Sequence, residues 1–175
     1  SRRLQAQDVI QYFDASQLRD PDRVATAPEL EVEQLIDVVI EKPSSEVIAM
    51  IQRQLQAGTL NLNQQDPSGW TLLQMACNDS DKLDVAETLL SESSVDVTIV
   101  NIDGNSALHN LVRLRCPPEK AAARLSLIRK LLERNAASIE IANNSGETAL
   151  HVASWSGNVD AMAILLEAGA NPNLQ

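Results

Sequence analysis

The sequence predicts an all-α solenoid of stacked antiparallel helix pairs joined by β-hairpin-like loops. A run of eight residues recurs: Gly146–Ala153 has a close copy at Gly104–Leu111 and a poorer copy at Gly69–Ala76. A leucine pair lies downstream of each copy, at positions 89–90, 131–132 and 165–166. Composition agrees, because 44% of the residues are apolar but only 2% are aromatic, which favours a core of aliphatic side chains. One such unit cannot bury its apolar face alone, so neighbouring units must stack.

The repeated unit resembles the ankyrin repeat. That family has a turn, a helix that opens with a Thr-Pro-Leu-His-like tetrad, and a second helix with paired leucines. Here the tetrad reads Thr-Ala-Leu-His at 148–151 and Ser-Ala-Leu-His at 106–109. The glycines that precede the three copies lie 35 and 42 residues apart, close to the ankyrin period plus an insertion. The resemblance implies an ankyrin-repeat solenoid over about 85% of the chain.

We expect four units within this array. They are placed at residues 28–65, 66–100, 101–142 and 143–175. The first is degenerate, because it lacks the tetrad. Its first helix is expected over roughly 30–41, and a stripe of Val47, Ile48, Ile51 and Leu55 predicts a second helix that Gly58 ends.

Residues 1–27 show little repeat character. A short helix around Asp8–Phe13 is predicted to cap the first unit, followed by a linker. A docking motif that carries Tyr12 and Phe13 is the alternative. The chain ends at Asn171–Gln175, where the hairpin of a further unit would begin, so we expect it to be part of a longer array or protein.

Hydroxyl and glycine residues predict where the helices start and end. Thr71, Ser106 and Thr148 are expected to cap the first helix of each clear unit. Gly157 is expected to reverse the chain between two helices, and Gly169 to end the last helix in a left-handed conformation. Asn135 holds the corresponding place in the third unit, where Asn is the next best residue.

The third unit carries an insertion. Its glycine and leucine pair are 27 residues apart, against 19 in the fourth unit, and the extra residues fall around 113–124. Pro117 and Pro118 are expected to end the first helix and start a second helix over about 118–134. The insertion is either a tolerated loop or part of the binding face.

The charge pattern limits the classes of partner. A net charge of −10 argues against general nucleic-acid binding. Acidic residues dominate 66–100, and seven of the 14 basic residues lie within 113–134. The two strips are either a solvated surface or a means of steering a partner of complementary charge.

The sequence offers no recognisable catalytic, cofactor or metal site. It has no Gly-rich phosphate loop and no nucleophile motif. His109 and His151 both occupy the tetrad, where the resemblance implies that the imidazole ties its own helix start to an adjacent loop. Cys77 is expected in the core, and Cys116 in the insertion as a free thiol. We therefore predict no enzyme, no cofactor and no metal.

The resemblance implies partner binding on a concave face made of hairpin tips and the exposed sides of the first helices. Trp155 and Trp70 are the leading candidates, because Trp is enriched among binding hot spots. The alternative is that each covers a gap between repeats. The remaining candidates are Asn78, Asp79, Asn101, Ile102, Asn105, Arg113, Arg115, Asn143, Asn144 and Glu147.

These features predict a non-catalytic protein–protein interaction module of a larger regulatory, signalling or trafficking protein. The alternative is an intramolecular spacer or lid that packs against another domain of the same protein. We expect a protein partner, no direct nucleic-acid binding, no membrane insertion and a monomeric fragment. Two cysteines without a disulfide pattern and no signal sequence favour the cytoplasm or nucleus.

Overall fold

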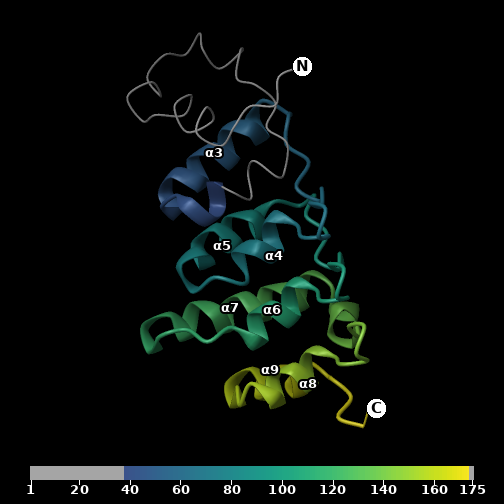
Figure 1. Cartoon of the computed structure of the whole chain (residues 1–175). Coiled ribbons are helices and arrows are strands. Elements are labelled where there is room, and N and C mark those ends of the chain that lie inside the picture. The colour runs from purple at the N-terminus through teal and green to yellow at the C-terminus, as the bar shows by residue number, and fades with distance from the viewer. Residues whose placement is uncertain (1–37, 174–175) are drawn as a thin grey trace.

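The computed structural model describes residues 38–173, and every structural statement below concerns this range. The segment predicted over 1–27 and most of the helix predicted over 30–41 lie outside it, although residues 38–41 are helical. The described part is built from helices that succeed one another in layers along one axis (Figure 1). The prediction of an all-α solenoid of helix pairs is therefore confirmed.

Three complete helix pairs follow a helix of the first unit. They are α4 (Leu72–Ala76) with α5 (Leu83–Ser91), α6 (Ala107–Arg113) with α7 (Pro118–Arg134), and α8 (Ala149–Trp155) with α9 (Val159–Glu167), all after α3 (Ser44–Gln56). First helices pack on first helices in the order α4, α6, α8, and second helices in the order α3, α5, α7, α9. The 3-10 turn η3 (Ser80–Lys82) lies between α4 and α5, and η4 (Ala136–Glu140) lies between α7 and α8.

Each of the three first helices begins with the predicted cap. The caps are Thr71, Ser106 and Thr148. The backbone N–H of each cap also donates to the side chain three residues later, which completes a capping box. In the last unit the Thr148 N–H donates to His151 Nδ1 over 3.1 Å. A proline at the next position would pre-organise the helix start, but these units carry Leu or Ala there. The capping box fixes the helix start instead.

The insertion of the third unit lengthens a helix. Helix α7 has 17 residues, whereas α5 and α9 have nine each. It runs over the predicted 118–134, and only residues 114–117 separate it from α6. Pro118 at its first turn lacks an N–H that would otherwise have no partner, so the Pro-Pro pair sets the start of the helix. Nearly all the extra residues therefore add helical turns.

Two glycines behave as predicted and one asparagine does not. Gly157 and Gly169 have φ of +66° and +94°, the left-handed conformation that lets the chain reverse after a helix. Asn135 was predicted to share it, but its φ is −152°. Its side chain instead accepts from the Ala137 N–H over 3.0 Å and caps η4. The prediction failed because a 3-10 turn follows α7 directly, and the N–H of its second residue donates to the asparagine oxygen.

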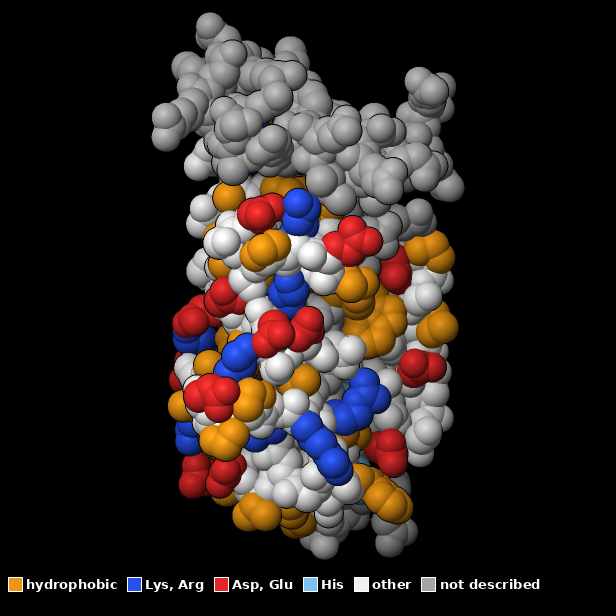
Figure 2. Space-filling view, turned by 60° about the vertical axis from the view of Figure 1, so that its left-hand side comes forward, with side chains coloured by type: hydrophobic (Ala, Val, Ile, Leu, Met, Phe, Trp, Pro, Cys, Tyr) orange, Lys and Arg blue, Asp and Glu red, His pale blue; other side chains and the backbone are white. Residues whose placement is uncertain are grey.

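The acidic and basic strips meet along the second helices. Lys120 pairs with Asp81, and Lys130 pairs with Glu87, so that α7 is joined to the preceding unit. Arg134 donates to two carbonyl oxygens at the end of α5. Figure 2 shows red and blue side chains side by side over part of this surface. Both ion pairs are exposed and so stabilise the fold little. Because these charges are paired with one another, fewer unpaired charges remain on the second helices to attract a partner.

Candidate functional site

One side chain organises each hairpin tip. Asn143, three residues before its glycine, accepts at Oδ1 from the N–H groups of Ser145 and Glu147, both over 3.0 Å. Asn101 does the same for the third unit and Asp66 for the second. The three tips are thus built on one plan, and these residues hold the turn.

This role corrects one prediction. Asn101 was expected to be exposed at its tip, but only 5% of its surface is accessible. The neighbouring tip covers it: a Cβ on Gly69, where φ is +76°, would lie 3.0 Å from the Asn101 Cα. Asn143 is half-buried, and its Nδ2 donates to Asn105 Oδ1 over 3.2 Å and to Glu147 Oε2 over 3.1 Å. The sequence could not show how closely adjacent tips approach.

Adjacent tips are joined by hydrogen bonds. The Ile102 N–H donates to the Ser68 carbonyl over 3.2 Å, and the Asn144 N–H donates to the Asp103 carbonyl over 2.9 Å. Asn144 adds a side-chain bond, from Nδ2 to the Ile102 carbonyl, over 2.7 Å. The Ile102 side chain remains 65% exposed. Of these predicted contact residues, Ile102 presents the larger free apolar surface, while the Asn144 amide already has a partner.

The tetrad position fastens α4 and α6 to the next tip. His109 Nε2 lies 3.1 Å from the Glu147 carbonyl oxygen, and its Nδ1 accepts from the Ser106 N–H over 3.2 Å. Since Nδ1 accepts, the proton sits on Nε2, which donates. Gln74 stands in this position in the second unit, and its Nε2 donates to the Asn105 carbonyl over 3.1 Å. The predicted scaffold role of His109 is confirmed, and Gln74 performs it with an amide.

Residues at or just beyond the ends of the first helices occupy equivalent positions in successive units, here called a column. Arg113 lies nine residues after Gly104, and Trp155 lies nine residues after Gly146. Asn78 has the same place in the second unit and is exposed, as is Arg113. The Trp155 side chain is 82% exposed, so it does not cover a gap between repeats.

Three further candidates have other positions. Asp79 is half-buried and caps η3, because its Oδ1 accepts from the Asp81 N–H over 2.8 Å. Trp70 is half-buried at its tip, where its backbone is bonded to Asp66 in both directions. Arg115 is exposed in the loop between α6 and α7. Asp79 is therefore occupied with the local turn, whereas Arg115 is available to a partner.

Trp155 borders a groove of about 300 Å³ between the third and fourth units, here called the Trp155 groove. It contains five of the predicted candidates, drawn from two tips and two helices. The lining residues are Asn105, His109, Arg113, Asn143, Glu147, Val152, Trp155 and Ser156. Amides, one cation and one carboxylate thus surround an indole, an arrangement that suits a peptide recognised by hydrogen bonds around an apolar anchor.

A second groove, the arginine cleft, adjoins the first. It measures about 200 Å³ and lies between the α6–α7 and α8–α9 loops. Its lining residues are Arg113, Leu114, Arg115, Cys116, Arg124, Ser156, Gly157 and Asn158. Arg113 and Ser156 line both grooves, which therefore lie side by side.

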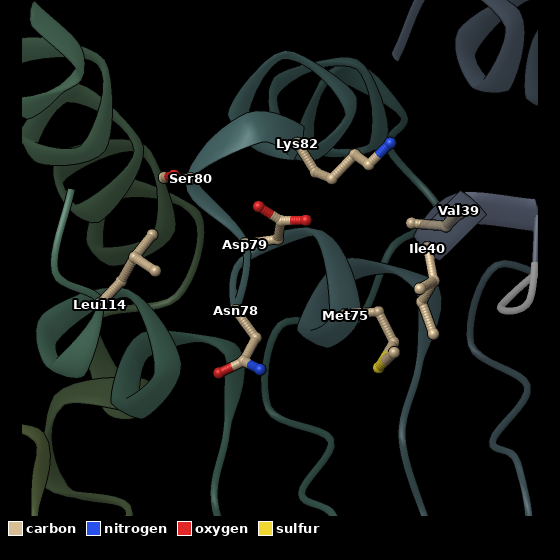
Figure 3. A pocket seen from close by; sticks show the side chains of 8 residues that line it. All are labelled: Val39, Ile40, Met75, Asn78, Asp79, Ser80, Lys82 and Leu114. Carbon is tan, nitrogen blue, oxygen red and sulfur yellow. The ribbon is translucent and has the colours of Figure 1, made fainter. Parts of the chain in front are cut away.

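A third groove of about 450 Å³ extends towards the first unit (Figure 3). In that view Val39, Ile40 and Met75 lie on one side and Leu114 on the other, with Asp79 between them. Leu114 also lines the arginine cleft, so the three grooves form a series across the units. We call this series the inner groove.

Sequence reasoning missed the residues that shape the middle of the inner groove. Arg124 is only 8% exposed, and its Nη1 and Nη2 donate to the Leu114 carbonyl over 2.6 Å and to Asn158 Oδ1 over 2.9 Å. Asn158 in turn donates to the Val112 carbonyl over 3.0 Å. A buried arginine looks like a surface residue in a sequence, so no signal pointed to it. Arg113 and Trp155, in contrast, were both among the predicted contact residues.

The buried titratable groups have the surroundings of structural side chains rather than of catalytic ones. Burial lowers the pKa of His109 below its ordinary 6.5, with a carbonyl partner acting in the opposite sense. Burial raises the pKa of the Cys77 thiol far above its usual range, so this thiol stays protonated in the core. Within residues 38–173, no three His, Cys, Asp or Glu side chains lie together as metal ligands would. None of the helices in this range combines the length and apolar character that a membrane span needs.

Comparison with protein-family models agrees with this geometry. A model described as ankyrin repeats, three copies, matches residues 118–175, and one described as ankyrin repeat matches residues 68–102. Together the two matches cover just over half of the 175 residues. Residues 103–117, which include α6 with Arg113 and the loop with Arg115, lie between the two matches.

Proposed function

The chain belongs to the ankyrin-repeat family, and we propose that it is a non-catalytic interaction module that binds an extended segment of a protein partner. Repeats of this family generally mediate protein–protein interactions. The proposed contact surface is the inner groove together with the exposed hairpin tips. The proposed setting, a larger regulatory, signalling or trafficking protein in the cytoplasm or nucleus, rests on the sequence alone.

The exposure of Trp155 is the observation that carries the proposal. An indole that is 82% exposed leaves a large apolar surface in water, which is unfavourable unless a partner covers it. It stands beside a groove whose other lining residues are, apart from Val152, polar or charged. Binding hot spots combine an aromatic anchor with a polar surround in this way.

The length of the inner groove supports an extended partner segment. The column from Asn78 through Arg113 to Trp155 crosses three units, and helix layers pack roughly 10 Å apart. A strand-like peptide advances roughly 3.3 Å per residue, so about six residues would span the column. A segment of this length can contact all three parts of the inner groove at once.

The test compares two exposed apolar side chains. Trp155→Ala should weaken partner binding by about 2 kcal/mol or more, roughly 30-fold in Kd. Val159→Ala is the matched control, because Val159 is 72% exposed but lies on α9 outside the inner groove. Both variants should keep the melting temperature of the parent. Equal affinities for parent and Trp155→Ala would contradict the proposal, and binding only to other regions of its own full-length protein would favour an intramolecular lid.

A further inference from the structure

The arginine cleft holds three guanidinium groups and no carboxylate. Arg113, Arg115 and Arg124 line it together with neutral residues. The lysines of α7 differ, since Lys120 and Lys130 each have an acidic partner. None of the three arginines forms an ion pair within residues 38–173.

Arg124 makes this charge difficult to neutralise from within the protein. It is buried, and both acceptors that it meets are neutral: the Leu114 carbonyl and the Asn158 amide oxygen. A buried cation without a counter-charge is unfavourable, because low-dielectric surroundings replace its hydration. The exposed Arg113 and Arg115 add two positive charges at the mouth of the same cleft. An anion supplied from outside would be favoured there.

We propose that the arginine cleft binds an acidic side chain of the partner segment, next to the apolar residue that the segment places against Trp155. This inference rests on the proposed function and adds the chemical class of the segment. The carboxylate would accept charge-assisted hydrogen bonds from Arg113 and Arg115, which can reach it from the exposed side. Arg124 acts as a positioning residue, since its hydrogen bonds tie the two loops together and its charge adds to the positive potential of the cleft.

Glu147 fixes where along the segment the acid belongs. Its carboxylate lines the Trp155 groove on the side of the tips and accepts from Asn143 Nδ2. An acid placed in that groove would face a like charge, whereas the arginine cleft presents only positive charge. Arg113 and Trp155 lie one unit apart, roughly 10 Å, so the acid should lie within about three residues of the apolar anchor.

The experiment uses the 175-residue chain and a display library of random twelve-residue peptides. Peptides selected on the parent chain are sequenced, and the tightest is made in two forms, one with each acidic residue replaced by its amide. Affinities are measured for the parent, Arg115→Gln, Arg113→Gln and Trp155→Ala. Arg129→Gln is the control, because Arg129 is exposed on α7, outside the cleft, and its loss changes the net charge equally.

We expect the selected peptides to be enriched in Asp or Glu near an aromatic or aliphatic residue. Removal of that acid should weaken binding to the parent about tenfold, since charged hydrogen bonds are among the stronger ones, but should weaken binding to Arg115→Gln less than half as much. Peptides that depend on Trp155 but show no acidic preference would overturn this inference and leave the proposed function intact. Peptides indifferent to Trp155, or none at all, would contradict the proposed function and with it this inference.

Discussion

His109 of the third unit donates from Nε2 to the carbonyl oxygen of Glu147 in the fourth, across 3.1 Å. The same imidazole receives the N–H of Ser106, the cap of its own helix. One side chain therefore joins a helix start to the next hairpin tip. Because Glu147 and His109 also line the Trp155 groove, this bond holds one wall of the proposed binding site in place.

Replacing His109 should show that the bridge needs one acceptor and one donor rather than an imidazole. His109→Ala should lower the free energy of unfolding by about 2–3 kcal/mol, because it leaves the Ser106 N–H and the Glu147 carbonyl without partners. His109→Gln should cost less than about 1 kcal/mol, because Gln74 makes the equivalent bonds in the second unit. Urea denaturation measures both. Equal losses for the two variants would contradict the bridging role.

The buried neutral His109 predicts a loss of stability in mild acid. Its pKa in the folded chain is lowered from 6.5, so the unfolded chain binds the proton first as the pH falls. The contribution is complete above pH 6.5 and declines below it, levelling off once the folded form is also protonated. The carboxyls whose pKa is lowered, Asp81 and Asp96, titrate below 3.8 and so outside this window.

This dependence is measured by urea denaturation at several values between pH 7.5 and 5. The parent should lose stability over that range, and His109→Gln should show a smaller loss. Identical slopes for the parent and His109→Gln would show that the proton binds elsewhere.

Two glycines with the same backbone conformation should respond differently to alanine. Gly104 and Gly146 both have φ of +78°. A Cβ on Gly104 would lie 2.7 Å from the Asn144 amide nitrogen, whereas nothing lies within 4 Å of one on Gly146. Gly146→Ala should therefore cost about 1 kcal/mol for the left-handed conformation alone, and Gly104→Ala about 3 kcal/mol or more. Thermal denaturation of the pair tests whether tip-to-tip packing limits the array.

Arg124 should be a structural residue despite its charge. Arg124→Ala removes the two hydrogen bonds to Leu114 and Asn158 and the packing of the side-chain stem, so we expect a loss of about 2–3 kcal/mol. Arg124→Lys should restore little, because an ammonium group cannot reproduce the planar fork. Arg129→Ala on the same helix should change stability by less than about 0.5 kcal/mol. Full rescue by lysine would show that charge alone matters at this position.

The parts of the fold that depend on nearest neighbours could be predicted from the sequence. Thr148 caps its helix because the hydroxyl and the unpaired N–H groups are only two or three residues apart. Pro117 and Pro118 fix the start of α7 by the same local chemistry, and the bounds 118–134 followed from them. Trp155 likewise lies only four residues after His151, at the end of the same short helix, although the sequence does not show its exposure.

Asn135 was mispredicted because of a local 3-10 turn, whereas the other errors and omissions involve contacts between units. Asn101 is buried because the tip carrying Gly69 approaches it, and that distance depends on how layers stack rather than on either residue. Arg124 is buried because the α8–α9 loop of the next unit lies over it and supplies Asn158. Hydropathy assigns such an arginine to the surface. The partner-binding roles of the exposed residues remain proposals, since no contact within the chain bears on them.

The fluorescence of Trp155 in a Trp70→Phe variant reports directly whether a partner segment covers the exposed indole, because Trp155 is then the only tryptophan. Because Trp155 is exposed, we expect a red-shifted emission that acrylamide quenches readily in the free chain, as for an indole in water. A saturating selected peptide should shift the emission to the blue and protect it from quenching. An emission that is already blue-shifted in the free chain would contradict the exposure of Trp155. An emission that a bound peptide leaves unchanged would contradict its role as the anchor of the binding site.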